Sequence, residues 1–430
     1  SNWSNFTKSI IMKKLEVLGA AKLKGQIRIS GSKNASLPIL AATLLSDKKI
    51  FLTNLPKVKD VETMIKLLES MGAKVKISKN RNSLTIQNNK KIKTEASYNL
   101  MSTMRAGIIV LGPLLARFGK AKVSTPGGCS IGVRPIDIHL QALKKMGVQY
   151  KIINGYVYAK AKKGLIGAKI KFPNISVGAT ENLMIAACLA KGKTILSNCA
   201  IEPEIKDLSN FLCSIGAEIA WTGKRQVKIT GVKTFKQSNY KIMFDRIEAG
   251  TMLILAAINQ NNLKITAIEP GILKTEINVL KKIGAKIIQK KNEIIIKGSK
   301  KIKSINIKTS PYPGFPTDLQ AQLMVLLCKA NNKSVIKEDI FENRFQSVSE
   351  LKRMDAKIKV KGNQAMIEGN TAFKGAQVMA TDLRASASLV LAALCAKGKT
   401  TISRIYHLDR GYEDLEKKLK KVGAKIRRVN

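Results

Sequence analysis

Six short stretches of the chain share one pattern, in which an apolar residue precedes a glycine and a small residue follows it. They recur about every 70 residues, so six copies account for nearly the whole chain. A glycine in this place is typical of a helix end, because it adopts the left-handed conformation needed before a strand begins. One copy has Asp355 instead, and aspartate tolerates that conformation better than most residues. The six copies are Met71-Gly72-Ala73, Met146-Gly147-Val148, Ile215-Gly216-Ala217, Ile283-Gly284-Ala285, Met354-Asp355-Ala356 and Val422-Gly423-Ala424.

Each repeat also contains an earlier helix-like segment that is apolar on nearly all faces, which predicts burial. The helix that ends in the glycine is amphipathic, and short alternating or β-branched segments between the helices predict strands. The sequence thus predicts an α/β (α+β) fold of six repeated βαβαββ units in two three-unit lobes, an inside-out α/β barrel with buried helices and outer sheets. The six buried segments are Ala35–Leu45, Ala106–Ala116, Ala179–Ala190, Glu248–Ile258, Thr317–Lys329 and Ala385–Ala396.

The repeats suggest how the chain divides into domains. Residues 1–11 read as an extension that lies outside the fold. We expect the first lobe to consist of residues 12–32 plus 243–430, and the second lobe to consist of residues 33–242. The second lobe would carry the glycine-rich loop around Cys129. A chain of 430 residues is long enough for two lobes with their own cores.

The chain is strongly basic, with 76 Lys and Arg against 29 Asp and Glu and a formal net charge of +47. Such a charge raises nucleic-acid binding as a hypothesis. However, the lysines are spread through all segments and aromatic residues are only 5%, so we expect no specific nucleic-acid partner. The charge favours small anionic substrates instead. Because no apolar run approaches the roughly 18 residues of a membrane span, we expect a cytoplasmic protein without a membrane partner. The oligomeric state is left open.

The cysteines and histidines limit the chemistry that the chain can perform. With two histidines and no Cys-x-x-Cys pair among six cysteines, we expect no metal and no cofactor. Cys188, Cys328 and Cys395 lie in apolar helix-like runs, where cysteine is usually a small core residue. Cys129 differs, because it follows the flexible Pro126-Gly127-Gly128 and precedes an arginine. A thiol in that setting could be a low-pKa acid or nucleophile, although a surface turn with an incidental cysteine fits these residues equally well.

Polar residues stand at the start of each buried helix. Helix N-termini present unpaired N–H groups and a partial positive charge, which suits phosphate. Six helix starts around a shared cleft would therefore attract anions strongly. The Gly-Lys-Thr triplets at 192–194 and 398–400 are not phosphate loops, because the required earlier glycine is missing and they follow helices. The residues at the helix starts are Lys33-Asn34, Arg105, Ser176-Val177-Gly178, Asp245-Arg246, Asp318 and Asp382–Arg384.

Seven segments of the chain carry recognisable motifs: Gly31–Ala35, Pro126–Asp137, Ser176–Thr180, Phe315–Asp318, Phe341–Phe345, Asp382–Ser388 and Arg404–Tyr412. They resemble motifs of the enolpyruvyl transferase superfamily, in the order and at the spacing of that superfamily. The resemblance runs from about Met12 to the C-terminus. Within it, residues 126–137 are similar to the active-site loop of the members that act on UDP-N-acetylglucosamine.

The resemblance implies a transferase that moves the enolpyruvyl group of phosphoenolpyruvate to the 3-hydroxyl of UDP-N-acetylglucosamine and releases phosphate, the first committed step of peptidoglycan synthesis. Addition followed by elimination needs an acid, a base and a cationic clamp. The resemblance implies that Cys129 protonates C3 of phosphoenolpyruvate and reacts covalently with the substrate and with the epoxide inhibitor fosfomycin. It implies that Asp318 takes or orients the proton of the hydroxyl. The position of Asp318 also suits a helix cap, and both roles can hold together.

The resemblance also implies the binding residues, because arginine forks and helix starts suit carboxylate and phosphate groups. Asn174 departs from members that carry a lysine there, which leaves more of the diphosphate contact to the helix start at Ser176. His407 and Glu202 are implied to have support roles only. Closure of the Cys129 loop over the substrates is expected to expel water. The residues implied for phosphoenolpyruvate are Lys33, Asn34, Arg134, Arg384 and Arg410. Those implied for UDP-N-acetylglucosamine are Arg105, Arg134, Pro135, Ile136, Asp137, Ile138, Asn174, Ile175, Ser176, Val177, Asp318 and Ile340.

Two alternatives to this function remain open. A shikimate-pathway enolpyruvyl transferase would share the fold, but the resemblance disfavours it, because that relative uses neither Cys129 nor a uridine pocket like Arg134–Ile138. An RNA-binding or RNA-end-processing protein on a related repeat is suggested only by the charge. Saturable, salt-sensitive RNA binding in preference to UDP-sugar binding would favour the latter.

Overall fold

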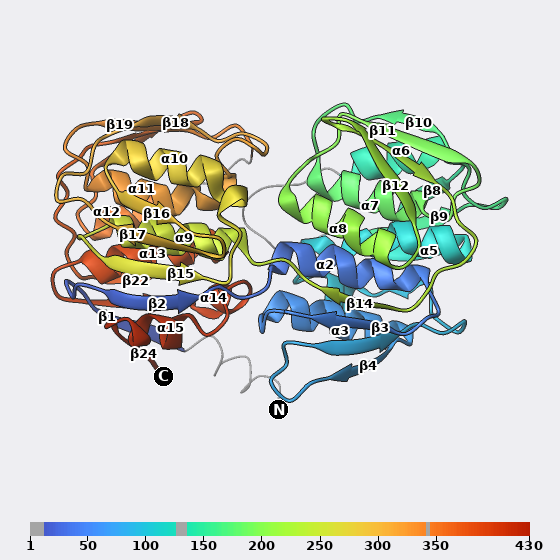
Figure 1. Ribbon diagram of the computed structural model, residues 1–430, viewed down its shortest axis with the longest axis horizontal. Helices are drawn as coiled ribbons and strands as arrows, with labels where there is room; N and C mark the ends of the chain where they lie inside the picture. The colour runs from blue at the N-terminus through green and yellow to red at the C-terminus, as the bar shows by residue number, and fades with distance from the viewer. Residues whose placement is uncertain (1–12, 126–135, 341–344) are drawn as a thin grey trace. The chain divides into compact units, whose positions relative to one another are not determined.

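The computed structural model describes residues 13–125, 136–340 and 345–430, together with the backbone but not the side chain of Arg105. The described residues form two compact units, one of residues 13–30, 244–340 and 345–430 and the other of residues 31–125 and 136–243 (Figure 1). We call them unit 1 and unit 2, and each is described by itself. The chain passes from unit 1 to unit 2 after Ser30 and returns after Met243.

The strands are short, mostly of three to six residues. They are β1 (Lys14–Leu18), β2 (Lys24–Arg28), β3 (Ile50–Thr53), β4 (Lys74–Ile77), β5 (Leu84–Gln87), β6 (Glu95–Ala96), β7 (Lys120–Ser124), β8 (Gln149–Ile153), β9 (Tyr156–Lys160), β10 (Lys169–Lys171), β11 (Lys193–Ser197), β12 (Glu218–Gly223), β13 (Gln226–Thr230), β14 (Ser238–Lys241), β15 (Asn262–Thr266), β16 (Lys286–Gln289), β17 (Glu293–Lys297), β18 (Asn306–Lys308), β19 (Ser334–Lys337), β20 (Ile358–Lys361), β21 (Gln364–Ile367), β22 (Gln377–Met379), β23 (Lys399–Ser403) and β24 (Lys425–Val429).

The helices alternate with these strands along the chain. The α-helices are α2 (Lys33–Ala42), α3 (Lys59–Met71), α4 (Tyr98–Met101), α5 (Leu111–Phe118), α6 (Asp137–Lys145), α7 (Val177–Ala187), α8 (Pro203–Ser214), α9 (Arg246–Ala257), α10 (Lys274–Ile283), α11 (Gln320–Cys328), α12 (Val348–Arg353), α13 (Leu383–Cys395), α14 (Tyr406–Asp409) and α15 (Leu415–Lys421). The 3₁₀ helices are η1 (Thr43–Leu45), η2 (Arg105–Val110), η3 (Pro270–Leu273) and η4 (Thr317–Leu319).

The described strands form six separate four-stranded sheets and no closed barrel of strands, three sheets in each unit. In every sheet one outer strand runs parallel to its neighbour, and the remaining pairs are antiparallel. Parallel neighbours need a crossover connection, and in the three sheets built from one continuous stretch a buried helix provides it. This arrangement confirms the α/β fold of six repeats.

Three of the six sheets contain a strand from a distant part of the chain, which a simple reading of the repeat does not predict. Strand β2 pairs with β15 within unit 1, although it precedes α2 of unit 2 in sequence. Strand β14 pairs with β3 within unit 2, although it precedes α9 of unit 1. Strand β1 completes the sheet that contains β23 and β24. The hydrophobic alternation that predicts a strand does not say which strand it will pair with.

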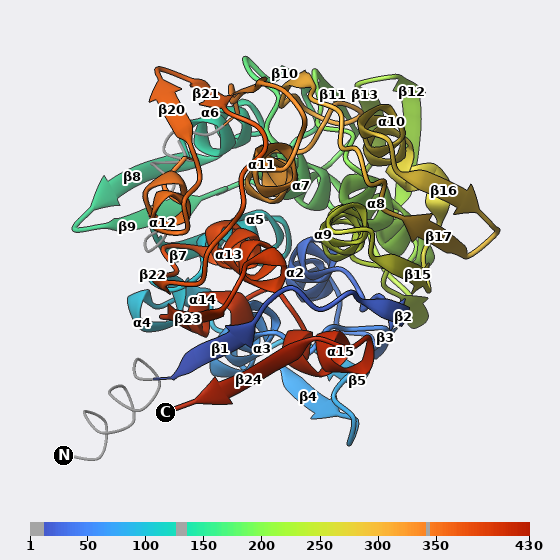
Figure 2. The same cartoon turned by 90° about the vertical axis from the view of Figure 1, so that its left-hand side faces the viewer.

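Three helices form the interior of each unit, as the apolar repeats predict. In unit 1, α11 contacts both α9 and α13, and all residues of α9 and α11 are buried. In unit 2, α7 contacts α2 and α5. Figure 2 looks along these helices and shows the strands around them. Because full burial of a Leu or Ile side chain contributes roughly 1.5–3 kcal/mol, helices that are apolar on all faces are stable only in such an interior.

The left-handed residues predicted at the ends of the amphipathic helices are present. The five glycines of the repeat, at positions 72, 147, 216, 284 and 423, have φ values between 96° and 116°. Asp355 occupies the same place with φ of 75°, which confirms that aspartate substitutes for the sixth glycine. In each repeat this conformation lets the chain reverse from the helix into the outer strand of its sheet.

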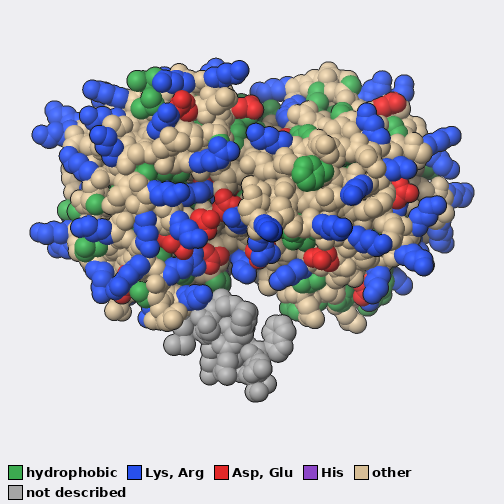
Figure 3. Space-filling model, turned by 60° about the horizontal axis from the view of Figure 1, so that its bottom comes forward, with side chains coloured by type: hydrophobic (Ala, Val, Ile, Leu, Met, Phe, Trp, Pro, Cys, Tyr) green, Lys and Arg blue, Asp and Glu red, His purple; other side chains and the backbone are tan. Residues whose placement is uncertain are grey.

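The positive charge is dispersed, as the even spread of lysines predicts. In the face drawn in Figure 3, Lys and Arg side chains are scattered over both units with acidic side chains between them. Within the described part of the chain, no helix is both long and apolar enough to cross a membrane.

Candidate functional site

The start of α2 in unit 2 holds Lys33 and Asn34 in a fixed backbone. Ser32 caps the helix, because its Oγ accepts a hydrogen bond from the backbone N–H of Ala35 at 3.0 Å. The N–H of Ser32 donates in turn to the carbonyl oxygen of Met243 at 2.8 Å. Lys33 and Asn34 are the first two residues of the helix and are partly exposed, while the residues after them are buried. The sequence prediction therefore places both side chains correctly at a helix start.

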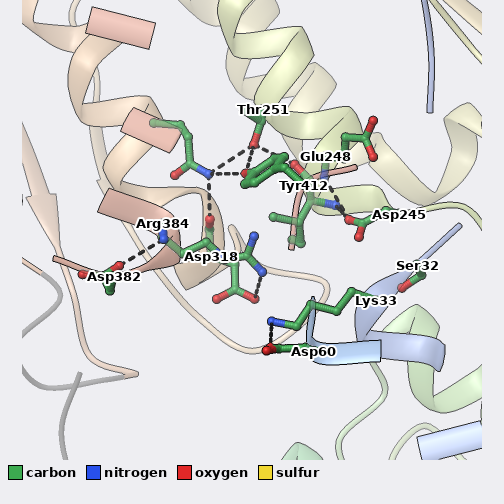
Figure 4. A network of polar contacts seen from close by, with 12 residues as sticks. Ser32, Lys33, Asp60, Asp245, Glu248, Thr251, Asp318, Asp382, Arg384 and Tyr412 are labelled. Carbon is green, nitrogen blue, oxygen red and sulfur yellow. Dashed lines mark hydrogen bonds and ion pairs between the residues drawn. The ribbon is translucent and has the colours of Figure 1, made fainter. Parts of the chain in front are cut away.

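Lys33 has a carboxylate partner that the sequence analysis missed. Its Nζ lies 2.7 Å from Oδ2 of Asp60, and both side chains are largely buried, at 12% and 6% exposure. Asp60 lies in the first turn of α3, where an acidic residue is common because it favours the positive end of the helix dipole. Because an acidic residue is expected at this position in any case, the sequence did not indicate that Asp60 would pair with Lys33. The ion pair holds the ammonium group of Lys33 in place beside the start of α2 (Figure 4).

The starts of α6 and α7 lie against each other in unit 2. Ile136 is the N-cap residue of α6, and Asp137 and Ile138 form its first turn. Asn174, Ile175 and the N-cap Ser176 lead into α7, whose first residue is Val177. A Cβ atom on Gly178 would lie 3.2 Å from Cε1 of His139, so the absence of a side chain at Gly178 lets the two helix starts approach. The structure thus brings together two of the segments implied for the sugar nucleotide.

His139 is held at this junction as a neutral imidazole. The Oδ1 atom of Asn182 accepts from the backbone N–H of Gly112 at 2.7 Å, which fixes the orientation of the amide. Its Nδ2 donates to the carbonyl of Ile108 and to Nδ1 of His139, both at 3.1 Å. Because Nδ1 must accept, the ring proton lies on Nε2. Burial lowers the pKa of His139 to about 4.

This buried imidazole predicts a pH dependence of stability. Between pH 4 and 6.5 the unfolded chain binds a proton at His139 that the folded chain does not, so acidification through this window destabilises the fold. The full effect is roughly 3 kcal/mol. Urea unfolding of wild type and His139→Gln should show a shallower loss of stability with acid in the variant. Parallel curves of unfolding free energy against pH for the two proteins would contradict the assignment. Carboxylates that titrate in the same pH range affect both proteins equally, so their contribution drops out of the comparison.

In unit 1, Arg384 and Asp318 come together from two helix starts. The Nη2 atom of Arg384 lies 3.5 Å from Oδ2 of Asp318, with the side chains 12% and 24% exposed. Arg384 is fixed through its backbone, because Asp382 caps α13 and accepts from the N–H groups of Arg384 and Ala385, each at 3.0 Å. Burial alone would lower the pKa of Arg384, but Asp318, Tyr412 and Asp245 raise it above its ordinary value. The guanidinium is therefore a permanent cation beside a carboxylate (Figure 4).

Asp318 does not hold either N-cap position at the start of its helix. It is the middle residue of η4, and Pro316 and Leu319 are the N-cap residues of η4 and α11. Its side chain is instead directed toward Arg384. A cation and a proton acceptor at this distance can bind an anion and deprotonate a hydroxyl beside it.

Arg410 follows the four-residue helix α14, which contains His407. The rings of His407 and Tyr406 lie 4.3 Å apart, and burial followed by the nearby Arg410 lowers the pKa of His407. Arg428 on β24 holds the end of this helix: its Nη1 donates to Oδ2 of Asp409 at 2.8 Å, its Nη2 also contacts Asp409, and its Nε donates to Glu416 at 2.5 Å. Such a fork between two carboxylates fixes the turn that carries Arg410.

Replacing Arg428 by lysine is expected to destabilise the protein by roughly 2 kcal/mol, because a point charge cannot make the fork. The matched control is the adjacent Arg427, whose guanidinium contacts Glu16 from an exposed position. Arg427→Lys should change the thermal midpoint little, since exposed pairs contribute little. Equal shifts of the thermal midpoint in the two variants would be inconsistent with this account.

Two further implied residues occupy structural positions. The backbone N–H of Ile340 donates to Oε2 of Glu338 at 3.0 Å, so a sugar contact at Ile340 would use its carbonyl oxygen. Glu202 is buried and is the N-cap residue of α8, where its carbonyl accepts from the N–H of Ile205 at 2.9 Å. The support role inferred for Glu202 stays a prediction.

Cys129, Arg134 and Pro135 lie outside the described residues, and for Arg105 only the backbone at the start of η2 is described. Three cysteines are buried as predicted: Cys328 and Cys395 are the last residues of α11 and α13, and Cys188 directly follows α7. Among the described residues, no group of three or more His, Cys, Asp or Glu side chains could hold a metal ion.

Comparison with known proteins gives consistent results. The family EPSP synthase (3-phosphoshikimate 1-carboxyvinyltransferase) matches residues 17–419. The UDP-N-acetylglucosamine 1-carboxyvinyltransferase of Pelagibacter ubique is 73% identical over 97% of this chain and its own full length. The enzyme of the same name from Geotalea uraniireducens is 52% identical over the same share.

Solved structures share the fold. The enolpyruvyl transferase NikO from Streptomyces tendae superposes with a TM-score of 0.89 at 24% identity. The alignment covers 97% of this chain and 99% of the NikO chain. EPSP synthase from Acinetobacter baumannii has a TM-score of 0.76 at 19% identity, and the alignment covers 97% of this chain and 100% of that enzyme's chain. The family match and the full-length relatives confirm the resemblance inferred from the sequence motifs. Because the family match spans almost the whole sequence and the relatives align along their full length, this chain belongs to the EPSP synthase family of carboxyvinyltransferases.

Proposed function

We propose that this protein transfers the enolpyruvyl group of phosphoenolpyruvate to the 3-hydroxyl of UDP-N-acetylglucosamine, releasing phosphate. The observation that carries this proposal is the full-length 73% identity to a UDP-N-acetylglucosamine 1-carboxyvinyltransferase. The product of such a transfer is the first committed precursor of peptidoglycan, so the protein acts in cell wall biogenesis. The absence of a membrane-crossing helix among the described residues is compatible with the cytoplasmic location that we propose.

The Arg384–Asp318 pair supports the chemistry of the addition step. Asp318 accepts the proton of the sugar 3-hydroxyl while the oxygen of that hydroxyl forms a bond to C2 of phosphoenolpyruvate. Arg384, which lies 3.5 Å from that carboxylate, holds the anionic end of phosphoenolpyruvate beside it. A guanidinium fork matches either a carboxylate or a phosphate with two parallel hydrogen bonds.

The remaining steps need a proton donor and further cations. Cys129 supplies the proton that C3 gains on addition. The bond from C2 to the bridging oxygen then breaks, phosphate leaves, and C3 loses a proton to restore the double bond. We propose that Lys33, Asn34, Arg134 and Arg410 complete the clamp on phosphoenolpyruvate. A high density of fixed cations stabilises the negative charge of the leaving phosphate.

For the sugar nucleotide, the junction of α6 and α7 supports a binding segment. The two helices meet at His139 and Gly178, which directly follow the segments Ile136–Ile138 and Asn174–Val177 in sequence. We propose that the first of these segments, with Arg134 and Pro135, contacts the uridine and that the second contacts the diphosphate at the positive end of α7. We propose that Arg105, Asp318 and Ile340 also contact UDP-N-acetylglucosamine. We also propose that units 1 and 2 correspond to the two functional lobes.

The proposal is tested by following phosphate release from phosphoenolpyruvate with two acceptors. Release is expected with UDP-N-acetylglucosamine and not with shikimate 3-phosphate, the acceptor of EPSP synthase. The opposite preference would assign the protein to shikimate metabolism instead. Release that is equal with and without an acceptor would indicate simple hydrolysis and contradict both functions.

A further inference from the structure

The imidazole of His139 in unit 2 presents one N–H group that has no acceptor among the described residues. The residue is only 6% exposed. Its Nδ1 accepts from Nδ2 of Asn182 at 3.1 Å, so the ring proton lies on Nε2. A buried donor without an acceptor costs free energy, and such groups are therefore rare unless a ligand or water meets them. The Nε2–H is thus a donor that the known contacts of the chain do not use.

The edge of the ring that carries Nε2 faces the start of α7. Gly178 is the second residue of that helix, and a Cβ atom on it would lie 3.3 Å from Nε2 and 3.2 Å from Cε1 of His139. Because Gly178 has no side chain, the imidazole lies directly beside the backbone of the first helical turn. The Nε2–H is therefore next to the backbone N–H groups of that turn.

The first turn of α7 also has donors to spare. Ser176 uses two of the N–H groups, because its Oγ accepts from Ala179 at 3.2 Å and its carbonyl accepts from Thr180 at 3.1 Å. Within the described chain, the N–H groups of Val177 and Gly178 have no acceptor. Val177 is 39% exposed, so the turn can be reached from solvent. Two backbone donors at the positive end of an eleven-residue helix, with an imidazole N–H beside them, suit an anion.

Asn182 fixes the direction of this imidazole donor before any ligand binds. Its Oδ1 accepts from the backbone N–H of Gly112 at 2.7 Å, and a backbone N–H can only donate, so the amide cannot turn over. Its Nδ2 donates to Nδ1 of His139 and to the carbonyl of Ile108. Asn182 lies in α7, which contacts η2, α5 and α6 (Figure 1). A donor held in this way loses little freedom when it binds a ligand.

We propose that His139 is a further binding residue for UDP-N-acetylglucosamine, whose Nε2–H donates to a phosphate oxygen of the diphosphate, and that Asn182 is the positioning residue that sets its tautomer. Burial lowers the pKa of His139 to about 4, so at neutral pH the contact is a hydrogen bond without a charge. Such a donor matters more here because Asn174 is neutral. The inference rests on the proposed function for the identity of the anion.

Three substitutions and one matched control separate this role from a contribution to stability. His139→Phe keeps an aromatic ring and removes both nitrogens. His139→Gln supplies an amide N–H in place of the Nε2–H and is the conservative rescue. Asn182→Leu removes the amide at nearly equal volume. The control is Asn88→Leu, because Asn88 is 1% exposed and its amide donates to the carbonyl and to Oγ1 of Thr43, also in unit 2.

Calorimetry gives the Kd of each protein for UDP, uridine and inorganic pyrophosphate, and melting temperatures report stability. His139→Phe is expected to raise the Kd for UDP and for pyrophosphate by about tenfold, because a hydrogen bond to a charged group is lost. Its Kd for uridine, which has no phosphate, should not change. His139→Gln should recover most of the affinity for UDP.

The other two variants test the role of Asn182. Asn182→Leu should raise the Kd for UDP several-fold, since the ring is then free to take the other tautomer. Asn88→Leu should lower the melting temperature and leave the Kd for UDP unchanged. In steady-state assays of His139→Phe, the KM for UDP-N-acetylglucosamine should rise and the KM for phosphoenolpyruvate should not.

Two results would overturn the role of His139. One is an equal Kd for UDP in wild type and His139→Phe. The other is a loss of affinity for uridine as large as the loss for UDP, which would indicate a general distortion of unit 2. If wild type releases no phosphate with UDP-N-acetylglucosamine, the proposed function is wrong. Binding of pyrophosphate by wild type and His139→Phe then still decides whether His139 serves an anion, because equal Kd values would exclude it.

Discussion

Asp318→Asn is expected to lower kcat by about a thousandfold while leaving the KM for phosphoenolpyruvate unchanged or lower. Asparagine keeps the shape of the side chain but cannot accept the proton of the sugar hydroxyl, and removal of a general base typically costs about 10²–10⁴ in rate. Binding is spared because Arg384 remains and loses the carboxylate that competes with the substrate for its guanidinium. Steady-state kinetics with both substrates separate the two effects.

The matched control for this variant is Asp339→Asn. Asp339 also forms an ion pair, with Lys308 at 2.9 Å, but it lies at the surface. The control should keep kcat within about twofold of wild type, because exposed ion pairs contribute little. If Asp318→Asn retained more than a tenth of the wild-type kcat, Asp318 would not be the base.

Cys129→Ser is the second substitution with a large expected effect. A serine hydroxyl is a much weaker acid than a thiol and cannot readily protonate C3, so we expect turnover to fall by about a hundredfold or more. The variant should also lose covalent labelling by fosfomycin. Full labelling of the serine variant would contradict the assignment of Cys129.

Most of the other cysteines should contribute little background labelling to this experiment. Burial raises the pKa of Cys199, Cys328 and Cys395 to about 12 in each case, and it raises the pKa of Cys188 as well, so their thiolates are scarce at neutral pH. Of the described cysteines, Cys213 is exposed. Cys213→Ser should therefore remove background alkylation and leave the fosfomycin-sensitive activity of wild type intact.

The fold could be predicted in detail because the sequence carries one signal six times. Each amphipathic helix must end in a residue that tolerates positive φ, and both the glycines and Asp355 satisfy this rule. The buried helices were predictable because their apolar residues cover all faces. The pairing of β2 with β15 and of β14 with β3 was not predictable, since a strand of four or five residues contains no information about a partner roughly 200 residues away.

The candidate site was predictable only where residues stand at helix starts. Lys33, Asp318 and Arg384 were identified by their place in the repeat and by the family motifs, and the structure places each at the start of a buried helix. Their partners gave no such signal. Asp60 looks like an ordinary residue of a first helical turn. The same holds for Asn182, which looks like an interior residue of an apolar helix although it contacts His139, 43 positions away.

The most direct test of the proposed reaction follows the bridging oxygen of phosphoenolpyruvate. The substrate is prepared with a heavy-oxygen label between C2 and phosphorus and is incubated with the enzyme and UDP-N-acetylglucosamine. Mass spectrometry then locates the label. Addition and elimination at C2 predict that all of the label leaves with phosphate and that the sugar product gains an unlabelled enol ether at its 3-hydroxyl. Label that remains with the three-carbon fragment would show cleavage between phosphorus and oxygen and would contradict enolpyruvyl transfer.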